Sequence, residues 1–160
     1  MDRIDDIDAR IIELLQENGR MRRNKIAEEV GLSLPSVSDR MRKLEERGII
    51  QSYHAVVNAK KLHVDITAFI RVNVDGSMHY QDVVEAACRL EGVMEVHSIT
   101  GEGSHMLKVR TRNTTTLERL LSAIQSIPGV HSTSSSIVLS TFKESHALPI
   151  RTLVAQPTAL

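Results

Sequence analysis

Cysteine and long apolar runs are nearly missing from this 160-residue chain. Its one cysteine, Cys88, cannot form an intrachain disulfide, and no group of Cys and His residues has the spacing of a structural zinc site. No apolar run approaches the roughly 20 residues that cross a bilayer, and the first residues lack the basic-then-apolar order of a secretory signal. We therefore expect a cytoplasmic protein without a membrane contact, a disulfide or a bound metal.

Residue combinations that support catalysis are also missing. The serine-rich run 132–136 has no partnered His and Asp, and the chain holds no phosphate-binding loop. None of the histidines stands three or four residues from another, although His97 and His105 lie on predicted strands joined by a glycine loop and could approach each other. The sequence therefore predicts no enzyme, no catalytic residue and no cofactor.

Charge is balanced over the whole chain but not along it. Of the 20 Lys and Arg residues, 12 fall within the first 61 positions. After an acidic opening, the stretch from Arg20 to Arg47 holds eight basic residues against five acidic ones. A local positive surface can bind phosphate even on a neutral chain, but an ordinary solvated helical face gives the same pattern.

Apolar residues at helical spacing predict three short helices at the start of the chain. The first runs over about 6–17 behind an Asp5 cap, and the second over about 23–30. Gly31 is free to take a positive φ and end the second helix, and Ser33 caps the third. Three short helices with a tight glycine turn before the third are typical of a helix-turn-helix, whose third helix enters the major groove of DNA.

The third helix buries one apolar stripe and leaves its opposite side available to DNA. Ser36 and Asp39 are candidates for base contacts because they lie outward in the leading turns. Arg40, Arg42 and Lys43 could either bond guanine or neutralise phosphates, and spacing does not separate these roles. The predicted DNA-binding residues are Arg22, Arg23, Ser33, Pro35, Ser36, Ser38, Asp39, Arg40, Arg42 and Lys43.

Beyond this helix, weak alternation over 53–57 predicts a short strand or wing. The second half then shows strand and helix patterns in the order strand-helix-strand-strand-helix-strand, which is the ferredoxin-like α+β sandwich. Thr114 is the predicted cap of the second of these helices. Two helices cover only one face of a four-stranded sheet, so we expect a homodimer through the sheets and a higher assembly. The expected strands cover 66–74, 93–100, 105–112 and 130–140, and the helices 80–90 and 114–127.

Both halves resemble the Lrp/AsnC family of prokaryotic regulators. In the first half the likeness rests on Asp5-x-x-Asp8 to Asn18-Gly19-Arg20, on Val30-Gly31-Leu32-Ser33 and on the run 40–50. In the second half it rests on 100–109, which is similar to the family's Gly-Asp-x-Asp-Tyr loop and the leucine-rich strand after it. The chain departs from the pattern at Arg22, where the family has a small polar cap, and at Ser104 and His105, which replace an acid and an aromatic.

The resemblance covers about residues 3–145 and implies the domain plan. We expect a helix-turn-helix domain over 1–57, a linker over 58–65, a ferredoxin-like assembly and effector domain over 66–145, and a C-terminal tail over 146–160. The tail is expected to be mobile or to pack on a neighbouring subunit.

The resemblance also implies an amino-acid site in the glycine loop, at a contact between dimers. Backbone N–H groups around Gly101 and Gly103 could take a carboxylate, and Glu102 could pair with an ammonium group. Taken without the family, the loop is better explained as a tight hairpin that uses glycine for its positive φ. The predicted effector-binding residues are Gly101, Glu102, Gly103, Ser104, His105, Ser134 and Ser136.

These features together predict a sequence-specific transcriptional regulator that binds a double-stranded DNA operator. We expect it to act as a homodimer that assembles further to a tetramer or octamer, with a small metabolite, an amino acid, modulating oligomeric state or DNA affinity. The alternative is an architectural protein that wraps DNA without an effector. An enzyme, or an enzyme's regulatory subunit, would leave the basic helix unexplained.

Overall fold

A computed structural model describes residues 4–76 and 79–155. The chain divides into two compact units, one drawn from residues 1–56 and 144–160 and the other from residues 57–143. Each unit has its own apolar core. Within the described ranges, no helix combines the length and the apolar character needed to cross a membrane.

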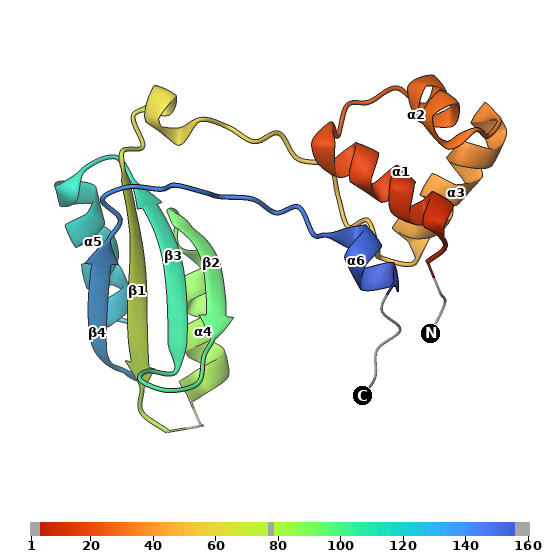
Figure 1. Cartoon of the computed structure of the whole chain (residues 1–160). Helices are drawn as coiled ribbons and strands as arrows, with labels where there is room; N and C mark the ends of the chain where they lie inside the picture. The colour runs from red at the N-terminus through yellow and green to blue at the C-terminus, as the bar shows by residue number, and fades with distance from the viewer. Residues whose placement is uncertain (1–3, 77–78, 156–160) are drawn as a thin grey trace. The chain divides into compact units, whose positions relative to one another are not determined.

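The first unit is a winged helix-turn-helix built on α1 (Asp6–Glu17), α2 (Arg23–Val30) and α3 (Leu34–Glu46), seen in Figure 1. The bounds of α1 and α2 and the start of α3 after Ser33 are those that the sequence predicts, because each of these helix ends carries a local signal. The Asp5 side chain accepts the N–H of the third residue of α1, Asp8, at 2.7 Å.

The turn between α2 and α3 also follows from local chemistry. Gly31 takes φ 67° and its N–H closes α2, while Ser33 begins α3 by accepting the N–H of Ser36. The three helices then meet through side chains that are fully or almost fully buried, among them Ile11, Ile26, Val37 and Leu44. The tight turn and this shared core fix the orientation of α3 within the unit.

The segment after α3 differs from the prediction. No strand forms over residues 53–57, and the Val56 side chain there is 93% exposed. A strand needs a hydrogen-bonded neighbour, and no described part of the chain pairs with this segment. The wing is therefore an unpaired extended segment.

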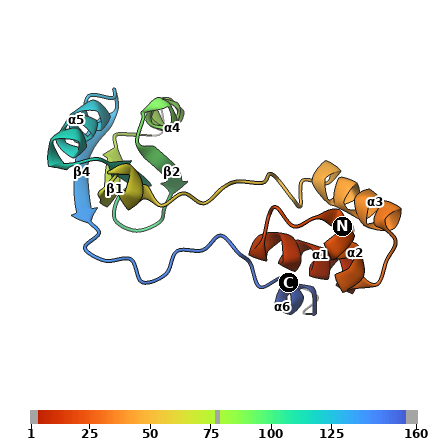
Figure 2. The ribbon, with the colours of Figure 1, turned by 90° about the horizontal axis from the view of Figure 1, so that it is seen from above.

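The described part of the C-terminal tail packs on the first unit. Its helix α6 (Ile150–Ala155) lies beside α1 (Figure 2), and Ile150 adds to the apolar core there. Leu148, just before α6, donates its N–H to the Gln16 side chain at 2.7 Å and accepts from the same amide at 3.0 Å. Arg151 pairs with Glu13 of α1 at 3.0 Å. The tail thus packs on its own chain.

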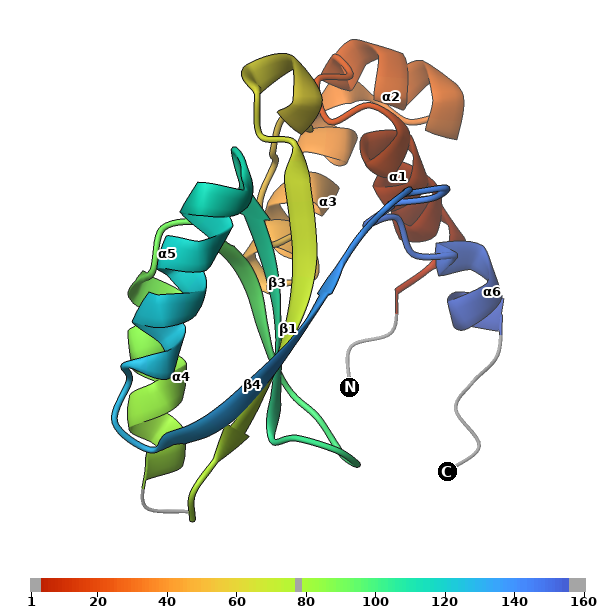
Figure 3. The same ribbon diagram turned by 90° about the vertical axis from the view of Figure 1, so that its left-hand side faces the viewer.

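The second unit is the predicted sandwich. A short 3-10 helix, η1 (Ala59–Leu62), precedes a four-stranded antiparallel sheet in the order β2-β3-β1-β4, with α4 and α5 on one face (Figure 3). This order is that of the ferredoxin-like fold. The elements are β1 (Ile66–Val74), α4 (Tyr80–Arg89), β2 (Val93–Ser98), β3 (His105–Thr111), α5 (Thr114–Gln125) and β4 (Val130–Ile137).

The two faces of the sheet differ in how far they are buried. Ala68, Ile70 and Val72 of β1 are fully buried against the helices, so their neighbours Phe69 and Arg71 point to the other face. We call that second face, which neither α4 nor α5 covers, the open face.

One predicted helix cap is wrong. Asn113, rather than Thr114, caps α5: its side chain accepts the Thr116 N–H at 2.9 Å, and the Thr116 hydroxyl accepts the Asn113 N–H at 3.0 Å. This reciprocal pair satisfies two N–H groups at the helix start, which a Thr114 cap would not do.

Candidate DNA interface and effector loop

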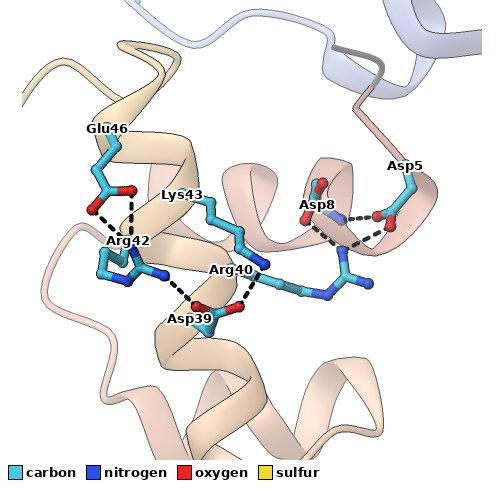
Figure 4. A network of polar contacts seen from close by, with 7 residues as sticks. All are labelled: Asp5, Asp8, Asp39, Arg40, Arg42, Lys43 and Glu46. Carbon is cyan, nitrogen blue, oxygen red and sulfur yellow. Dashed lines mark hydrogen bonds and ion pairs between the residues drawn. The ribbon is translucent and has the colours of Figure 1, made fainter.

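The outward side of α3 carries a network of charged side chains (Figure 4). The Asp39 carboxylate lies 2.5 Å from Nη2 of Arg42 and 2.8 Å from Nζ of Lys43. Nη1 of Arg42 also donates to both carboxylate oxygens of Glu46, at 2.7 and 2.8 Å. The side chains are roughly half exposed, so both cations are paired yet accessible to solvent.

These contacts shift the proton affinities of the groups involved. Lys43 and Arg42 hold the pKa of the Asp39 carboxyl below its usual range. Asp39 and Glu46 in turn raise the pKa of Arg42. Asp39 is consequently a carboxylate at neutral pH, and the exposed face of α3 carries acids as well as bases.

Arg40 faces away from this network toward α1. Its Nη1 atom lies 2.7 Å from a carboxylate oxygen of Asp8 and 2.7 Å from one of Asp5 (Figure 4). The Arg40 side chain is only 30% exposed. The structure thus places Arg40 between two helices, while its predicted DNA contact stays a prediction.

The remaining DNA-binding candidates lie at helix starts. Ser33, Pro35 and Ser36 are exposed around the first turn of α3, where the two serine hydroxyls share a 2.8 Å hydrogen bond, and Ser38 is half-buried in the next turn. Exposed Arg22 and Arg23 begin α2.

Helix α2 begins without a side-chain cap, as expected from Arg22 standing where the family has a small polar residue. Arg22 occupies the cap position without a side-chain hydrogen bond to the helix. The Arg22 guanidinium therefore makes no capping contact with α2.

The loop between β2 and β3 contains four of the predicted effector residues, Gly101, Glu102, Gly103 and Ser104. Gly101 and Gly103 have φ of 95° and 88°, conformations that favour glycine. Between them, the Glu102 side chain is 92% exposed and reaches Nη1 of Arg71 at 3.5 Å. The loop therefore presents one acid beside one base at the end of the open face.

Arg71 is a candidate site residue that the sequence prediction missed. It lies on β1 directly opposite Ser134 of β4, and Phe69 lies opposite Ser136. The two predicted serines thus share the open face with Arg71. Nε of Arg71 is buried without a hydrogen-bond partner among the described residues, and the guanidinium end is partly exposed. An arginine between an isoleucine and a valine within a predicted strand was the available signal.

Ser104 and His105 do not lie at the exposed tip of the loop. The Ser104 hydroxyl donates to the Val72 carbonyl at 3.0 Å and accepts the Val74 N–H at 3.2 Å, so it anchors the loop to β1. His105 is buried on the helix side of the sheet, with its ring centroid 4.3 Å from that of Tyr80. Burial lowers the pKa of His105.

The structure also separates the two histidines that flank the loop. His97 pairs with Met106 on the open face, whereas His105 is on the opposite face. They do not come together, because successive residues of a strand alternate between faces.

Two family models match this chain. A winged helix-turn-helix DNA-binding model covers residues 4–51, and an Lrp/AsnC ligand binding domain model covers residues 67–148. The HTH-type transcriptional regulator FL11 of Pyrococcus abyssi is 38% identical over 148 residues, which are 92% of this chain and 97% of that protein. The leucine-responsive regulatory protein of Escherichia coli is 31% identical over 154 residues, 93% of each chain.

Solved structures agree with these matches. A transcriptional regulator from Neisseria meningitidis, in complex with L-methionine, has a TM-score of 0.88 at 28% identity and covers 93% of this chain and 98% of its own. A feast or famine regulatory protein from M. tuberculosis, also with L-methionine, has a TM-score of 0.85 at 32% identity and covers 91% and 98%. With one family model matching the helix-turn-helix and another the sandwich, and a regulator 38% identical that aligns over 97% of its own length, this chain belongs to the Lrp/AsnC family of transcriptional regulators, which are not enzymes.

Proposed function

We propose that the protein is a sequence-specific operator-binding regulator whose α3 enters the major groove. The observation that carries this proposal is the outward side of α3, where Ser36, Asp39, Arg42 and Lys43 are accessible. On the opposite side Val37, Met41 and Leu44 are buried. In this assignment Ser36, Asp39 and Arg42 face base edges, because side chains in the leading turns reach furthest into the groove.

Other residues of the interface fix its position on the DNA. Lys43, Arg22 and Arg23 neutralise phosphates, and Ser33, Pro35 and Ser38 line the groove wall around the start of α3. Arg40 holds α3 against α1 through its two carboxylate partners.

Selection from a pool of random duplexes tests this function. The full-length protein is expected to enrich a two-fold symmetric site, and Arg42→Ala is expected to weaken binding to that site by about 1–3 kcal/mol. Arg119→Ala, which removes an exposed arginine from α5 in the other unit, is the matched control.

Two results would reject the assignment. Unchanged affinity of the Arg42 variant at both low and high salt removes Arg42 from the interface. Salt-dependent binding without any enriched sequence favours the architectural, DNA-wrapping alternative.

We also propose that the sandwich binds an α-amino acid at the glycine loop. Glu102 pairs with the ammonium group, while the Arg71 guanidinium, with the N–H groups near Gly101 and Gly103, takes the carboxylate. The exposed Arg71–Glu102 pair is long and contributes little stability, so a zwitterion can replace it at low cost. The two solved relatives that contain L-methionine support this ligand class.

The other predicted residues have subsidiary roles in this site. Ser134 and Ser136 offer hydroxyls on the open face beside Arg71 and Phe69. Ser104 and His105 hold the loop in place, since one is bonded to β1 and the other is buried.

Assembly connects the two sites. The open face is covered by a second copy in a homodimer, and dimers join further to a tetramer or octamer. Phe69, 40% exposed on this face, is an apolar contact for such a partner. A ligand that binds one oligomeric arrangement more tightly than another shifts the protein toward that arrangement. It can change the affinity for DNA by no more than its own difference in affinity for the two arrangements.

A thermal-shift screen against the twenty amino acids tests the effector proposal. The cognate amino acid at 100 times its Kd should stabilise the protein by about 2.7 kcal/mol. Glu102→Ala should abolish the shift and leave DNA binding intact, whereas Glu118→Ala, an exposed acid on α5, should leave both unchanged. A shift that survives in the Glu102 variant refutes the site.

A further inference from the structure

Acidic residues occupy the centre of the α3 face that we assign to DNA. Asp39 bonds Arg42 and Lys43 at once, and Glu46 holds Arg42 from one turn later (Figure 4). Two of the cations available to DNA are therefore neutralised by carboxylates on the same helix. Such a face differs from a simple basic surface, which attracts any phosphate.

Docking on DNA requires these pairs to rearrange. Exposed ion pairs contribute little net stability, so Arg42 and Lys43 can leave Asp39 readily. The carboxylate left behind then lies in a groove bordered by phosphates, and its loss of partners is unfavourable unless the DNA supplies a hydrogen-bond donor. In the major groove the base-edge donors are the amino groups of cytosine and adenine, and a carboxylate pairs best with cytosine N4.

Position along α3 distinguishes the two acids. Asp39 lies in the half of α3 nearer its N-terminus, one turn after Ser36, where recognition helices reach base edges. Glu46 is the last residue of α3, and so lies further from the bases. The two acids share Arg42 as a partner, but only Asp39 is placed to meet a base.

We propose that Asp39 determines which DNA sequence the protein prefers. On DNA without the operator sequence, Asp39 stays paired with Arg42 and Lys43. On the operator, the amino group of a cytosine takes the place of these two cations as the partner of Asp39. Arg42 then keeps only its exposed pair with Glu46, which it can exchange for a guanine next to that cytosine, and Lys43 can bind a phosphate. This role rests on the proposed DNA-binding function of α3.

The test compares Asp39→Asn with Glu46→Gln in the full-length protein. Each substitution removes one negative charge beside Arg42 and keeps the side-chain shape, and Asp39→Asn also removes the charge beside Lys43. The probes are the duplex selected by the wild-type protein and a random-sequence duplex of the same length, titrated over a series of salt concentrations. A second round of selection is carried out with each variant.

Asp39→Asn is expected to bind the random duplex about tenfold more tightly than the wild type, with a salt slope steeper by about one to two, because up to two cations become free for phosphates. Its selected site is expected to lose the cytosine, by roughly tenfold in preference, and to accept adenine, which an Asn amide reads. Glu46→Gln is expected to keep the wild-type base preference.

Two results would overturn the proposal. One is an Asp39→Asn variant that selects the wild-type sequence with its cytosine intact. The other is an identical change of base preference in both variants, which would assign the effect to charge alone. Failure of the underlying function gives a different result, since the wild-type protein would then select no sequence at all. Asp39→Ser, which cannot replace the carboxylate's two contacts, provides a second variant with the same expected loss of cytosine preference.

Discussion

Nη1 of Arg40 in α3 lies 2.7 Å from Oδ1 of Asp8 in α1. The Asp8 side chain is 12% exposed, which makes this the most enclosed carboxylate of the ion pairs in the described part of the first unit. An acid so little exposed needs its cation, because a charge left without a partner is costly to bury. The pair therefore adds a polar contact to the apolar core that holds α3 on α1.

Asp8→Ala is expected to lower the free energy of unfolding of the first unit by about 1–3 kcal/mol, since it leaves the Arg40 guanidinium with one carboxylate fewer. Urea unfolding followed by helical circular dichroism measures this loss. Asp6→Ala, an exposed acid of the same helix turn, is the control and should change stability by less than about 0.5 kcal/mol. Equal effects of the two substitutions would contradict the assigned role of Arg40.

Gly103→Ala is expected to disturb the effector loop more than Gly101→Ala. Both glycines have a positive φ, so each substitution costs about 1–2 kcal/mol of backbone strain. A Cβ at position 103 would also lie 2.6 Å from Cγ of Arg71, whereas one at position 101 meets no atom within 4 Å.

Differential calorimetry and amino-acid titration of the two variants check this expectation. The Gly103 variant should melt lower and lose the ligand response, because Arg71 must move. A Gly103 variant that is no less stable than the Gly101 variant would show that the loop does not pack on Arg71.

Stability of the second unit is expected to fall as pH drops below about 6.5, the ordinary pKa of histidine. Burial lowers the pKa of His105, so in that range the unfolded chain binds a proton that the folded chain does not. The stabilising effect is complete above pH 6.5 and is lost progressively toward the lowered pKa of the folded state.

Thermal melts between pH 7.5 and 5 measure this dependence in the wild type and in His105→Leu. The variant, which cannot titrate there, should show a smaller decrease in melting temperature. His97→Leu, on the open face, is the control and should retain the wild-type pH dependence. An equally steep decrease in His105→Leu would assign the effect to another group.

Gln16→Ala is expected to release the tail from α1, because it removes both hydrogen bonds to Leu148. Hydrogen exchange at Leu148 and through α6 should become faster, and the loss of stability should be about 1 kcal/mol. Glu17→Ala, at the exposed neighbouring position, should leave exchange in α6 unchanged. Unaltered exchange in the Gln16 variant would mean that other contacts alone hold the tail.

The helix ends of the first unit could be predicted because their causes are local. Asp5, Gly31 and Ser33 each act within three or four residues along the chain. The acids that pair with Arg42 were also readable, since Asp39 and Glu46 stand three residues before it and four after it.

Contacts between distant segments were not predictable in the same way. Arg40 and Asp8 are 32 residues apart, and the pairing of Arg71 with Ser134 depends on the register of two strands. The orientation of His105 was present as a signal, because it stands two residues before buried Leu107 on the same strand. The likeness to a family loop instead placed His105 among the effector-binding residues.

Tail packing makes the first unit discontinuous along the chain. Its helices α1 to α3 leave the ribosome first, yet the segment that covers α1 is synthesised only after residues 57–143. Domains generally fold as units in the order of synthesis. The first unit therefore acquires its last helix only after the whole sandwich has been synthesised, so α1 to α3 leave the ribosome before the segment that covers α1 exists.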